Sequence, residues 1–460
     1  MDDIETREAN SEIFTHKEIF KITLYFICFW IGINLLFSFI GILYKRGPVS
    51  LLWPVGKVTP MVPTIFGILI AISVFIGFLF LLKIRSIYEI KINIYYVIVI
   101  AILLIIGTNI FHGIWKGFVT PNEGHGGLMF YWDAIEIEDP LTYLRTYNER
   151  QEKMESHTRS HPPGAVLFYY LLYKIFIISG LMSLAILIIS TVFSAFFLYN
   201  ILKREINKDL SLYVTFLYFL IPAVQVYYLA NLYAIIATLY LGVIYFYMHP
   251  NNRKSLIGTI SFVSLSAFMT FMVVFIIGVL FCYELLRSYK TKSIKNFKNL
   301  YFILISLFVL FTIFLVVFDF NYIVSFLYTS QEVNPQGFRL IADPYDYFIT
   351  RVEDILEILF FFGPFLFLLF ICGFPIMKKD FPDFYLLVIS AIFFMLFLFS
   401  LGVYQTGETA RGCLYIYPFL IFPVAFYLNE MDFSLAEKNK LLILVFVQAI
   451  LMQLIGYYKW

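Results

Sequence analysis

Uninterrupted runs of about 20 apolar residues recur along almost the whole chain. An α-helix needs about 20 such residues to cross the hydrocarbon core of a bilayer. The runs do not alternate polar and apolar residues, as the strands of a membrane β-barrel would. With 61% hydrophobic and 14% charged residues, the 460-residue chain carries too much apolar surface for a water-soluble fold. The sequence therefore predicts an all-α polytopic membrane protein with about thirteen transmembrane helices.

These spans are expected at 18–44, 63–83, 93–112, 163–179, 182–202, 209–227, 229–248, 255–287, 300–319, 353–375, 384–402, 412–429 and 439–457. The run 255–287 is long for one helix and could be two short ones, but it is counted here as one span. With that count, the basic pairs at 203–204 and 253–254 fall on the outer side of the membrane, against the positive-inside rule. The order of sides between 163 and 287 therefore stays open.

Lysine and arginine in the short loops predict the orientation. Such residues follow the second, eighth and tenth spans: Lys83, Arg85, Lys91; Arg287, Lys290, Lys292, Lys295, Lys298; Lys378 and Lys379. Residues 1–17 lack the pattern of a cleaved signal and are expected to be a cytoplasmic tail. Residues 18–460 would then form one transmembrane domain of the plasma membrane. Its extracytoplasmic segments would be 113–162, 320–352 and 403–411.

The interval 111–164 is a long polar stretch in an otherwise apolar chain, and chemistry is expected there. It holds His112, His125, His157 and His161 together with the acids Glu123, Asp133, Glu136, Glu138 and Asp139. A carboxylate held beside apolar rings can keep a raised pKa and act as a general base. Asp133, with aromatic neighbours, is the first candidate, Glu123 the second, and Glu138 and Asp139 are held in reserve. For each acid the alternative is a solvated surface group.

Residues 140–154 predict an amphipathic helix lying in the membrane interface. Leu141, Leu144 and Tyr147 are three apart and share one face. Asp139 suits the N-cap and Pro140 the first helical position. The long polar loop is therefore expected to carry short interfacial helices.

Two further segments predict a phosphate site. His157, Arg159 and His161 directly precede Pro162 and a helix N-terminus, which favours anions. Arg411 lies in the third outward loop and could bind the same phosphate, with Glu408 orienting it or holding a sugar hydroxyl. The alternatives are a kinked helix start for the first segment and a local Glu408–Arg411 ion pair for the second.

Other compositional features favour no further chemistry. The net charge of +2 gives no indication of nucleic-acid binding. The four cysteines, Cys28, Cys282, Cys372 and Cys413, lie in or beside apolar runs without the spacing of a disulfide framework or a zinc site. A divalent Mg²⁺ or Mn²⁺ could assist a diphosphate at the loop acids, and the residues leave this open.

The polar loop, its short interfacial helices and the His161-Pro162-Pro163 run resemble the C-type (GT-C) glycosyltransferase superfamily, which includes protein O-mannosyltransferases and lipid-A aminoarabinose transferases. The stretch 407–411 also resembles a late loop of that superfamily. The resemblance implies a polyprenyl-phosphate-linked sugar donor, an inverting transfer, a loop carboxylate as base and basic residues at the departing phosphate. Members usually carry two adjacent loop acids where this chain has Asn122-Glu123, so the base stays open between Asp133 and Glu123.

Competing classes remain. A secondary transporter or a flippase of lipid-linked glycans is the main alternative, although transporters usually show repeat symmetry and polar residues at the membrane midplane. A non-catalytic membrane scaffold, or a zinc-dependent hydrolase using His157 and His161, is weaker still. The sequence favours a membrane glycosyltransferase of cell-envelope glycosylation that acts on a glycan, lipid or protein acceptor.

Overall fold

The computed structural model describes residues 14–56, 58–88, 93–124, 130–249, 253–404, 408–431 and 433–458. Within these residues the chain is a bundle of helices, and the paired strands described are the two-residue β1 (Thr59–Pro60) and β2 (Gly456–Tyr457), which are antiparallel. The predicted all-α class is therefore confirmed. Residues 1–13 of the predicted tail, Lys91, His125 and residues 405–407 of the third outward loop lie outside the described residues.

Six described helices are long and apolar enough to cross a bilayer: α1 (His16–Leu43), α2 (Ile65–Tyr88), α9 (Ser179–Leu202), α15 (Lys298–Phe318), α20 (Pro382–Ser400) and α23 (Leu435–Ile455). A seventh is α18 (Pro344–Phe362) taken with α19 (Pro364–Asp380), which meet at a 98° bend. The remaining bundle helices are α3 (Ile94–Asn109), α10 (Lys208–Leu220), α12 (Leu232–Tyr247), α13 (Arg253–Met269), α14 (Val273–Thr291) and α22 (Tyr417–Glu430). The chain is thus a multi-pass membrane protein, and the count of thirteen spans stays a prediction.

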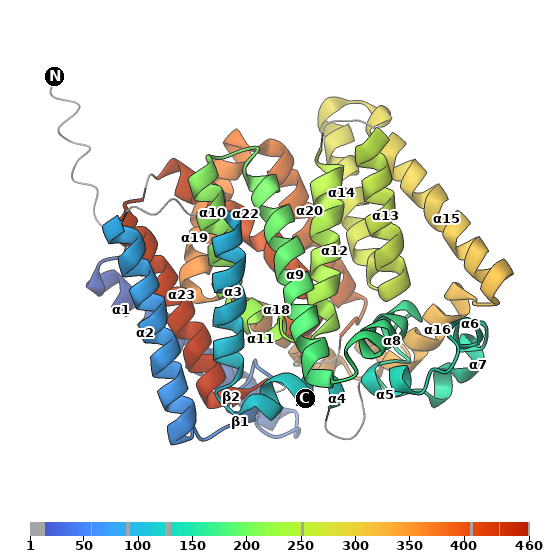
Figure 1. Ribbon diagram of the computed structural model, residues 1–460, viewed down its shortest axis with the longest axis horizontal. Coiled ribbons are helices and arrows are strands. Elements are labelled where there is room, and N and C mark those ends of the chain that lie inside the picture. Colours follow the sequence, from blue (N-terminus) through green and yellow to red (C-terminus); the bar gives the residue numbers. More distant parts are fainter. Residues whose placement is uncertain are drawn as a thin grey trace.

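Short helices gather at one end of the bundle, here called the loop end (Figure 1). They include η2 (Trp115–Val119), α4 (Thr120–Glu123), α5 (Phe130–Ile135), α6 (Pro140–Arg145), α7 (Tyr147–Arg150), η3 (Gln151–Lys153), α8 (Gly164–Phe176), α11 (Pro222–Tyr227), α16 (Tyr322–Val333), α17 (Arg339–Ala342), α21 (Thr409–Gly412) and η5 (Leu414–Ile416). The 3-10 helix η4 (Ile294–Phe297) joins α14 to α15 at the opposite end.

The predicted interfacial helix over 140–154 is present in three pieces, α6, α7 and η3. Asp139 accepts hydrogen bonds from the N–H groups of Leu141 (3.4 Å) and Thr142 (2.7 Å), and Pro140 occupies the first helical position. The capping prediction is confirmed. The helix breaks at Thr146, whose hydroxyl donates to the carbonyl of Thr142 at 2.8 Å.

The prediction of a single span over 255–287 is wrong. The chain forms α13 and α14 instead, because Thr270 interrupts the helix and its hydroxyl accepts the N–H of Met272 at 3.0 Å. Helix α13 packs back against α12 through reciprocal contacts, in which Gly242 faces the ring of Phe262 and Gly258 the ring of Phe246. A Cβ atom at either glycine would collide with the ring, so small residues permit this close pairing.

The prediction of a span over 163–179 also fails. Helix α8 has 13 residues, which reach about 20 Å at 1.5 Å per residue, short of a hydrocarbon core of about 30 Å. Figure 1 shows α8 beside α5 at the loop end rather than along the bundle. The two errors offset each other, so helices after α14 keep their predicted direction.

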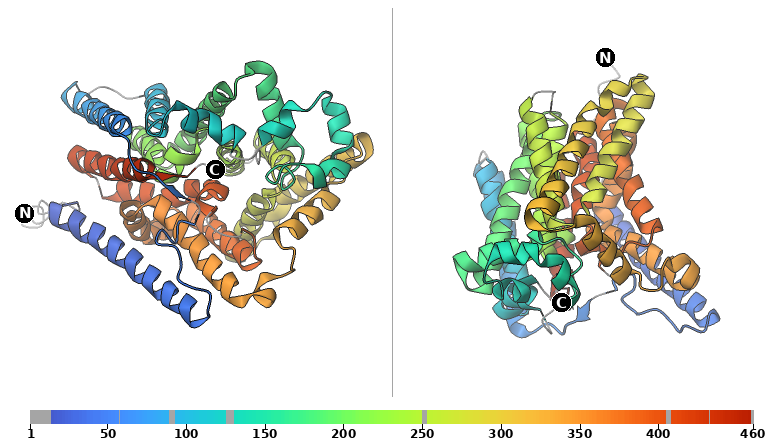
Figure 2. Two further views of the ribbon diagram at one scale, coloured as in Figure 1. Left: turned by 90° about the horizontal axis from the view of Figure 1, so that it is seen from below. Right: turned by 90° about the vertical axis from the view of Figure 1, so that its right-hand side faces the viewer.

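With both corrections, the basic residues of the short loops between the bundle helices fall at one end of the bundle. Helices α9, α12 and α14 end, and α10, α13 and α15 begin, at the end of the bundle opposite the loop end (Figures 1 and 2). The pairs 203–204 and 253–254 and the basic segment 287–298 lie at these helix termini and thus share one end, here called the basic end.

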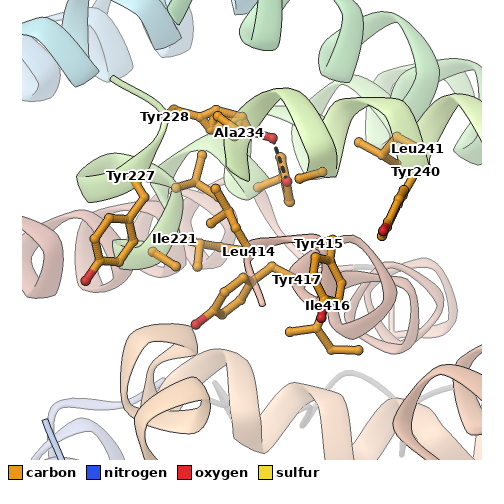
Figure 3. Packing of buried hydrophobic residues seen from close by; sticks show 14 of the residues in the cluster. Ile221, Tyr227, Tyr228, Ala234, Tyr240, Leu241, Leu414, Tyr415, Ile416 and Tyr417 are labelled. Carbon is orange, nitrogen blue, oxygen red and sulfur yellow. Dashed lines mark hydrogen bonds between the residues drawn. The ribbon is translucent and has the colours of Figure 1, made fainter. Parts of the chain in front are cut away.

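A core of buried hydrophobic residues, many of them aromatic, lies between α11, α12, η5 and the start of α22 (Figure 3), and α14 adds Phe275 to it. The ring of Tyr415 lies 5.2 Å from that of Tyr240 and 4.5 Å from that of Phe275. The Tyr240 hydroxyl donates to the carbonyl of Met272 at 2.6 Å, and the hydroxyls of Tyr218 and Tyr228 pair at 2.8 Å. Because these hydroxyls are satisfied, the buried rings stabilise the bundle without the cost of an unpaired polar group.

Candidate functional site

A pocket opens where the polar loop 111–164 meets the bundle at the loop end. It holds about 500 Å³ of space, part of it open to solvent. Its walls come from the loop, from α8, from the segment joining α11 to α12, from α21 and from the C-terminal segment. The lining residues are Pro121, Phe130, His157, His161, Tyr169, Tyr227, Leu229, Ala230, Asn231, Leu232, Tyr233, Arg411 and Tyr458.

The structure brings three of the predicted phosphate-binding residues together. His157, His161 and Arg411 line this one pocket although the third outward loop is far from the first in sequence. Arg411 is 6% exposed and His161 is 5% exposed, so both side chains are nearly withdrawn from water. Each side chain can therefore act on a ligand in a medium that screens charge weakly.

His161 is fixed by a tight turn. Its Nδ1 lies 2.9 Å from the carbonyl oxygen of His157, and its ring meets the ring of Phe130 edge-on at 5.0 Å. Since a carbonyl oxygen only accepts, Nδ1 carries the proton and Nε2 is an acceptor in the neutral ring. The Tyr147 hydroxyl donates to the His161 carbonyl and anchors the turn from below.

Burial lowers the pKa of His161 to about 4, opposed by the hydrogen bond to the His157 carbonyl and assisted by the nearby positive charge of Arg411. The ring is therefore neutral at pH 7, and among these three residues Arg411 is the one that carries a permanent charge. A phosphate in this pocket would be neutralised by Arg411, because the neutral His161 ring has its proton on Nδ1 and its Nε2 can accept a hydrogen bond but not donate one.

The His161 environment predicts an acid-sensitive stability. The folded-state pKa lies below the unfolded value of about 6.5, so protons bind preferentially to the unfolded chain. Stability is complete above pH 6.5 and falls as the pH drops toward 4, by up to roughly 3 kcal/mol. Thermal unfolding of the detergent-solubilised protein between pH 7.5 and pH 4 measures this loss. The variant His161→Asn keeps a donor near Nδ1 but does not titrate, so the gap in melting temperature between the two proteins should close as the pH falls; a constant gap would contradict the assignment.

Arg411 is held on α21 by one neighbour that the sequence analysis named and by one that it did not. Its Nη2 lies 3.2 Å from Glu408 Oε2, so the local ion pair considered above does form. The buried carboxylate of Glu357 accepts hydrogen bonds from the Thr409 N–H (2.8 Å), the Thr409 hydroxyl (2.6 Å) and the Ala410 N–H (3.3 Å). These contacts fix the start of α21 and hence the position of Arg411.

Arg351 holds the other arm of the same loop. It donates to the carbonyls of Phe399 and Val403, both at 2.7 Å, and of Tyr404 at 2.5 Å. Glu357 lay inside a run assigned to a span, and Arg351 lay just before it. A signal was present, because ionisable residues in an apolar run commonly mark function.

The two candidate bases occupy different places. Glu123 ends α4, two residues after Pro121 of the pocket wall, and its Oε1 accepts a hydrogen bond from the Ser179 hydroxyl at 2.6 Å. Asp133 is not among the described lining residues. Its carboxylate accepts the N–H of Glu155 at 3.2 Å, and burial raises its pKa.

The other predicted residues lie away from the pocket wall. Glu138 is exposed, Asp139 caps α6, and Arg159 pairs with Glu332 of α16 at 3.1 Å. Among the described residues no three histidine, cysteine or acidic side chains are arranged to hold a metal ion. All four cysteines are free, with Cys28 exposed and Cys413 buried.

Fold and site together define a helical, multi-pass membrane protein with a charged pocket at the end of the bundle opposite its basic end. Comparison with known proteins adds little to this description. No protein-family model and no curated protein matches the chain. Among solved structures, the crystal structure of ArnT from Cupriavidus metallidurans in the apo state is similar, with a TM-score of 0.39 and 13% identity. The similarity covers 68% of this chain and 59% of that chain.

Proposed function

We propose that this protein is a membrane glycosyltransferase that moves a sugar from a polyprenyl-phosphate carrier to an acceptor hydroxyl outside the cytoplasm. The observation that carries the proposal is the meeting of Arg411, His157 and His161 in one pocket at the loop end. A carrier lipid keeps its chain in the bilayer and its phosphate at the interface, which is the depth of such a pocket. The positive-inside rule places this end outside and the N-terminus in the cytoplasm.

The reaction assigned to the pocket is an inverting substitution. The acceptor oxygen attacks the anomeric carbon from the face opposite the phosphate, and the bond from that carbon to the phosphate oxygen breaks. The acceptor proton passes to a loop carboxylate, and the carrier phosphate leaves with the bonding electron pair. Arg411 stabilises the charge that develops on that phosphate, while Glu123 is favoured as the base because it adjoins the pocket wall.

The remaining wall suits a sugar. Aromatic rings of Tyr227 and Tyr233 and the amide of Asn231 line the pocket and offer both stacking surfaces and hydrogen-bonding groups. Asn231 also caps α12, accepting the N–H of Tyr233 at 3.0 Å, so this edge is rigid. A rigid polar edge can hold sugar hydroxyls in one orientation during the transfer.

A direct assay tests the proposal. The full-length protein, reconstituted in liposomes, is incubated with radiolabelled polyprenyl-phosphate sugars and membrane extracts that contain candidate acceptors. We expect label to move from the carrier lipid to a new product with inverted anomeric configuration and without nucleotide sugar. The proposal is overturned if the label stays on the carrier for every sugar and acceptor, provided that the protein elutes as a folded species.

A transporter remains the second candidate because of one observation, the 98° bend between α18 and α19 at Gly363. Transporters build substrate sites from such broken helices. Here the bend is formed by Gly363, which has φ +94°, and the Phe360 carbonyl three residues earlier accepts the Gln448 amide at 2.8 Å. Movement of labelled carrier between leaflets of the liposomes, without product formation, would favour this candidate.

A further inference from the structure

A second cavity of about 300 Å³ lies between α3, η2, α11 and α23. It is closed on one side by the C-terminal strand β2, which pairs with β1 at Thr59–Tyr457 and Pro60–Gly456. None of the candidate site residues of the sequence analysis lines this cavity. His112, one of the histidines of the polar interval, does line it. Two of its lining side chains, Gln453 and Lys116, carry donors for which no oxygen acceptor is found among the described residues.

The buried amide of Gln453 is the first of these donors. The Gln453 residue is 6% exposed, lines the cavity, and its Nε2 has no hydrogen-bond partner among the described residues. Its backbone carbonyl is already engaged, because it lies 2.8 Å from Nε2 of His112. A buried amide nitrogen left without an acceptor destabilises the fold, and a ligand oxygen would remove that cost.

The ammonium group of Lys116 is the second donor. Its Nζ lies 4.0 Å from the sulfur of Met61 and 5.9 Å from the centre of the Tyr457 ring. In the part of the chain that the structure describes, Lys116 pairs with no carboxylate. A positive charge beside an unsatisfied amide is suited to an oxygen-rich anion.

The second cavity adjoins the first. Tyr458 lines both, and the consecutive residues Val226 and Tyr227 of α11 line the second and the first respectively. The two cavities therefore share Tyr458 as a wall residue. Two neighbouring pockets with donors in both could each hold one of two substrates.

We infer that the cavity around Lys116, His112 and Gln453 is a second anion-binding site that takes a phosphate or carboxylate group. Resting on the proposed function, this group would belong to the acceptor, held beside the pocket that binds the sugar donor. The anion itself can come from a lipid headgroup or from a soluble molecule, and the chemistry at Lys116 is the same in both cases.

The test measures binding rather than transfer, with full-length protein in a neutral detergent. Inorganic phosphate is titrated calorimetrically, and phosphatidic acid is compared with diacylglycerol by native mass spectrometry. The variants are Lys116→Met and Gln453→Leu, with Lys174→Met as the matched control. Lys174 is also a lysine stacked on a tyrosine, 5.2 Å from the Tyr170 ring, but it is exposed and lies outside both cavities. Arg411→Ala removes the cation of the first pocket.

In the Arg411→Ala background we expect anion binding to persist and to fall at least tenfold on adding Lys116→Met, with a smaller loss for Gln453→Leu and none for Lys174→Met. Binding of phosphatidic acid alone identifies a lipid headgroup, and competition by free phosphate identifies a soluble anion. If Lys116→Met and Lys174→Met bind both probes equally, or if Arg411→Ala alone abolishes all binding, the second site is overturned. If the wild-type protein binds the anion through Lys116 but shows no sugar transfer in the liposome assay, the result counts against the proposed function and not against the second site.

Discussion

Replacing Arg411 with alanine is expected to lower sugar transfer at least about 100-fold, with little change in the amount of folded protein. Removing one group that stabilises developing charge costs about 10²–10³ in rate when the site is shielded from water. Arg411 is such a group, since it is buried in the pocket and is the one permanent cation among the predicted residues that line it. The rate of label transfer in liposomes, measured at saturating carrier lipid, gives kcat for the comparison.

Arg159→Ala is the matched control for Arg411→Ala. Both arginines were predicted to bind the donor phosphate, but Arg159 pairs with Glu332 at 3.1 Å outside the pocket wall. Its loss should change kcat less than about threefold, because Arg159 lies outside the pocket wall. The fold should also be retained, because a partly exposed ion pair contributes only about 0–1 kcal/mol to stability. Equal losses in the two variants would argue against a specific role for Arg411. If the Arg411→Ala protein is active, the ion pair with Glu408 is the only role left for Arg411 in the wild type.

Glu123→Gln is the second variant for which a large effect is expected. A general base contributes about 10²–10⁴ to a rate, and the amide cannot accept the proton of the attacking hydroxyl. The hydrogen bond from Ser179 can still be accepted by the amide oxygen, so the fold should be retained. Transfer should fall at least 100-fold without a change in melting temperature.

Asp133→Asn is the natural partner of that experiment. Its oxygen can still accept the N–H of Glu155, so the loop should keep its shape and transfer should stay within about fivefold of the wild type. The reverse pattern, an inactive Asp133→Asn and an active Glu123→Gln, would assign the base to Asp133. Full activity in both variants would remove the loop carboxylates from the mechanism.

Much of the fold follows from the sequence because the bilayer imposes strict rules. Long apolar runs predicted α1, α2, α9, α15 and α23, and the Asp139-Pro140 pair predicted the start of α6. These features are local, so a short window of sequence contains the whole cause.

The errors arose where the cause is not local. The break at Thr270 is accompanied by the packing of α13 against α12 through two glycine–phenylalanine contacts, which no hydrophobicity pattern contains. Helix α8 is apolar because it lies among other short helices at the loop end, not because it crosses the membrane. The misplaced basic pairs and the length of the run 255–287 were the two sequence signals that the span assignment needed revision.

The site was harder to predict than the fold. His161 and Arg411 were singled out, but the sequence could not say that they share a wall or that burial keeps His161 neutral. Glu357 was not chosen as a site residue, because the apolar residues after Gly363 led to one predicted span over 353–375. The amphipathic helix α18 before the bend was therefore not recognised. Its carboxylate matters only through contact with Thr409, which lies far along the chain.

The separation of the basic end from the loop end has an energetic consequence. Under the proposed orientation, the reaction would take place where neither ATP nor nucleotide sugars are present. All the free energy for glycosidic bond formation would then have to arrive already stored in the link between sugar and carrier phosphate. A cell using this protein would also need a separate step that turns the loaded carrier across the bilayer, and another that returns the spent carrier.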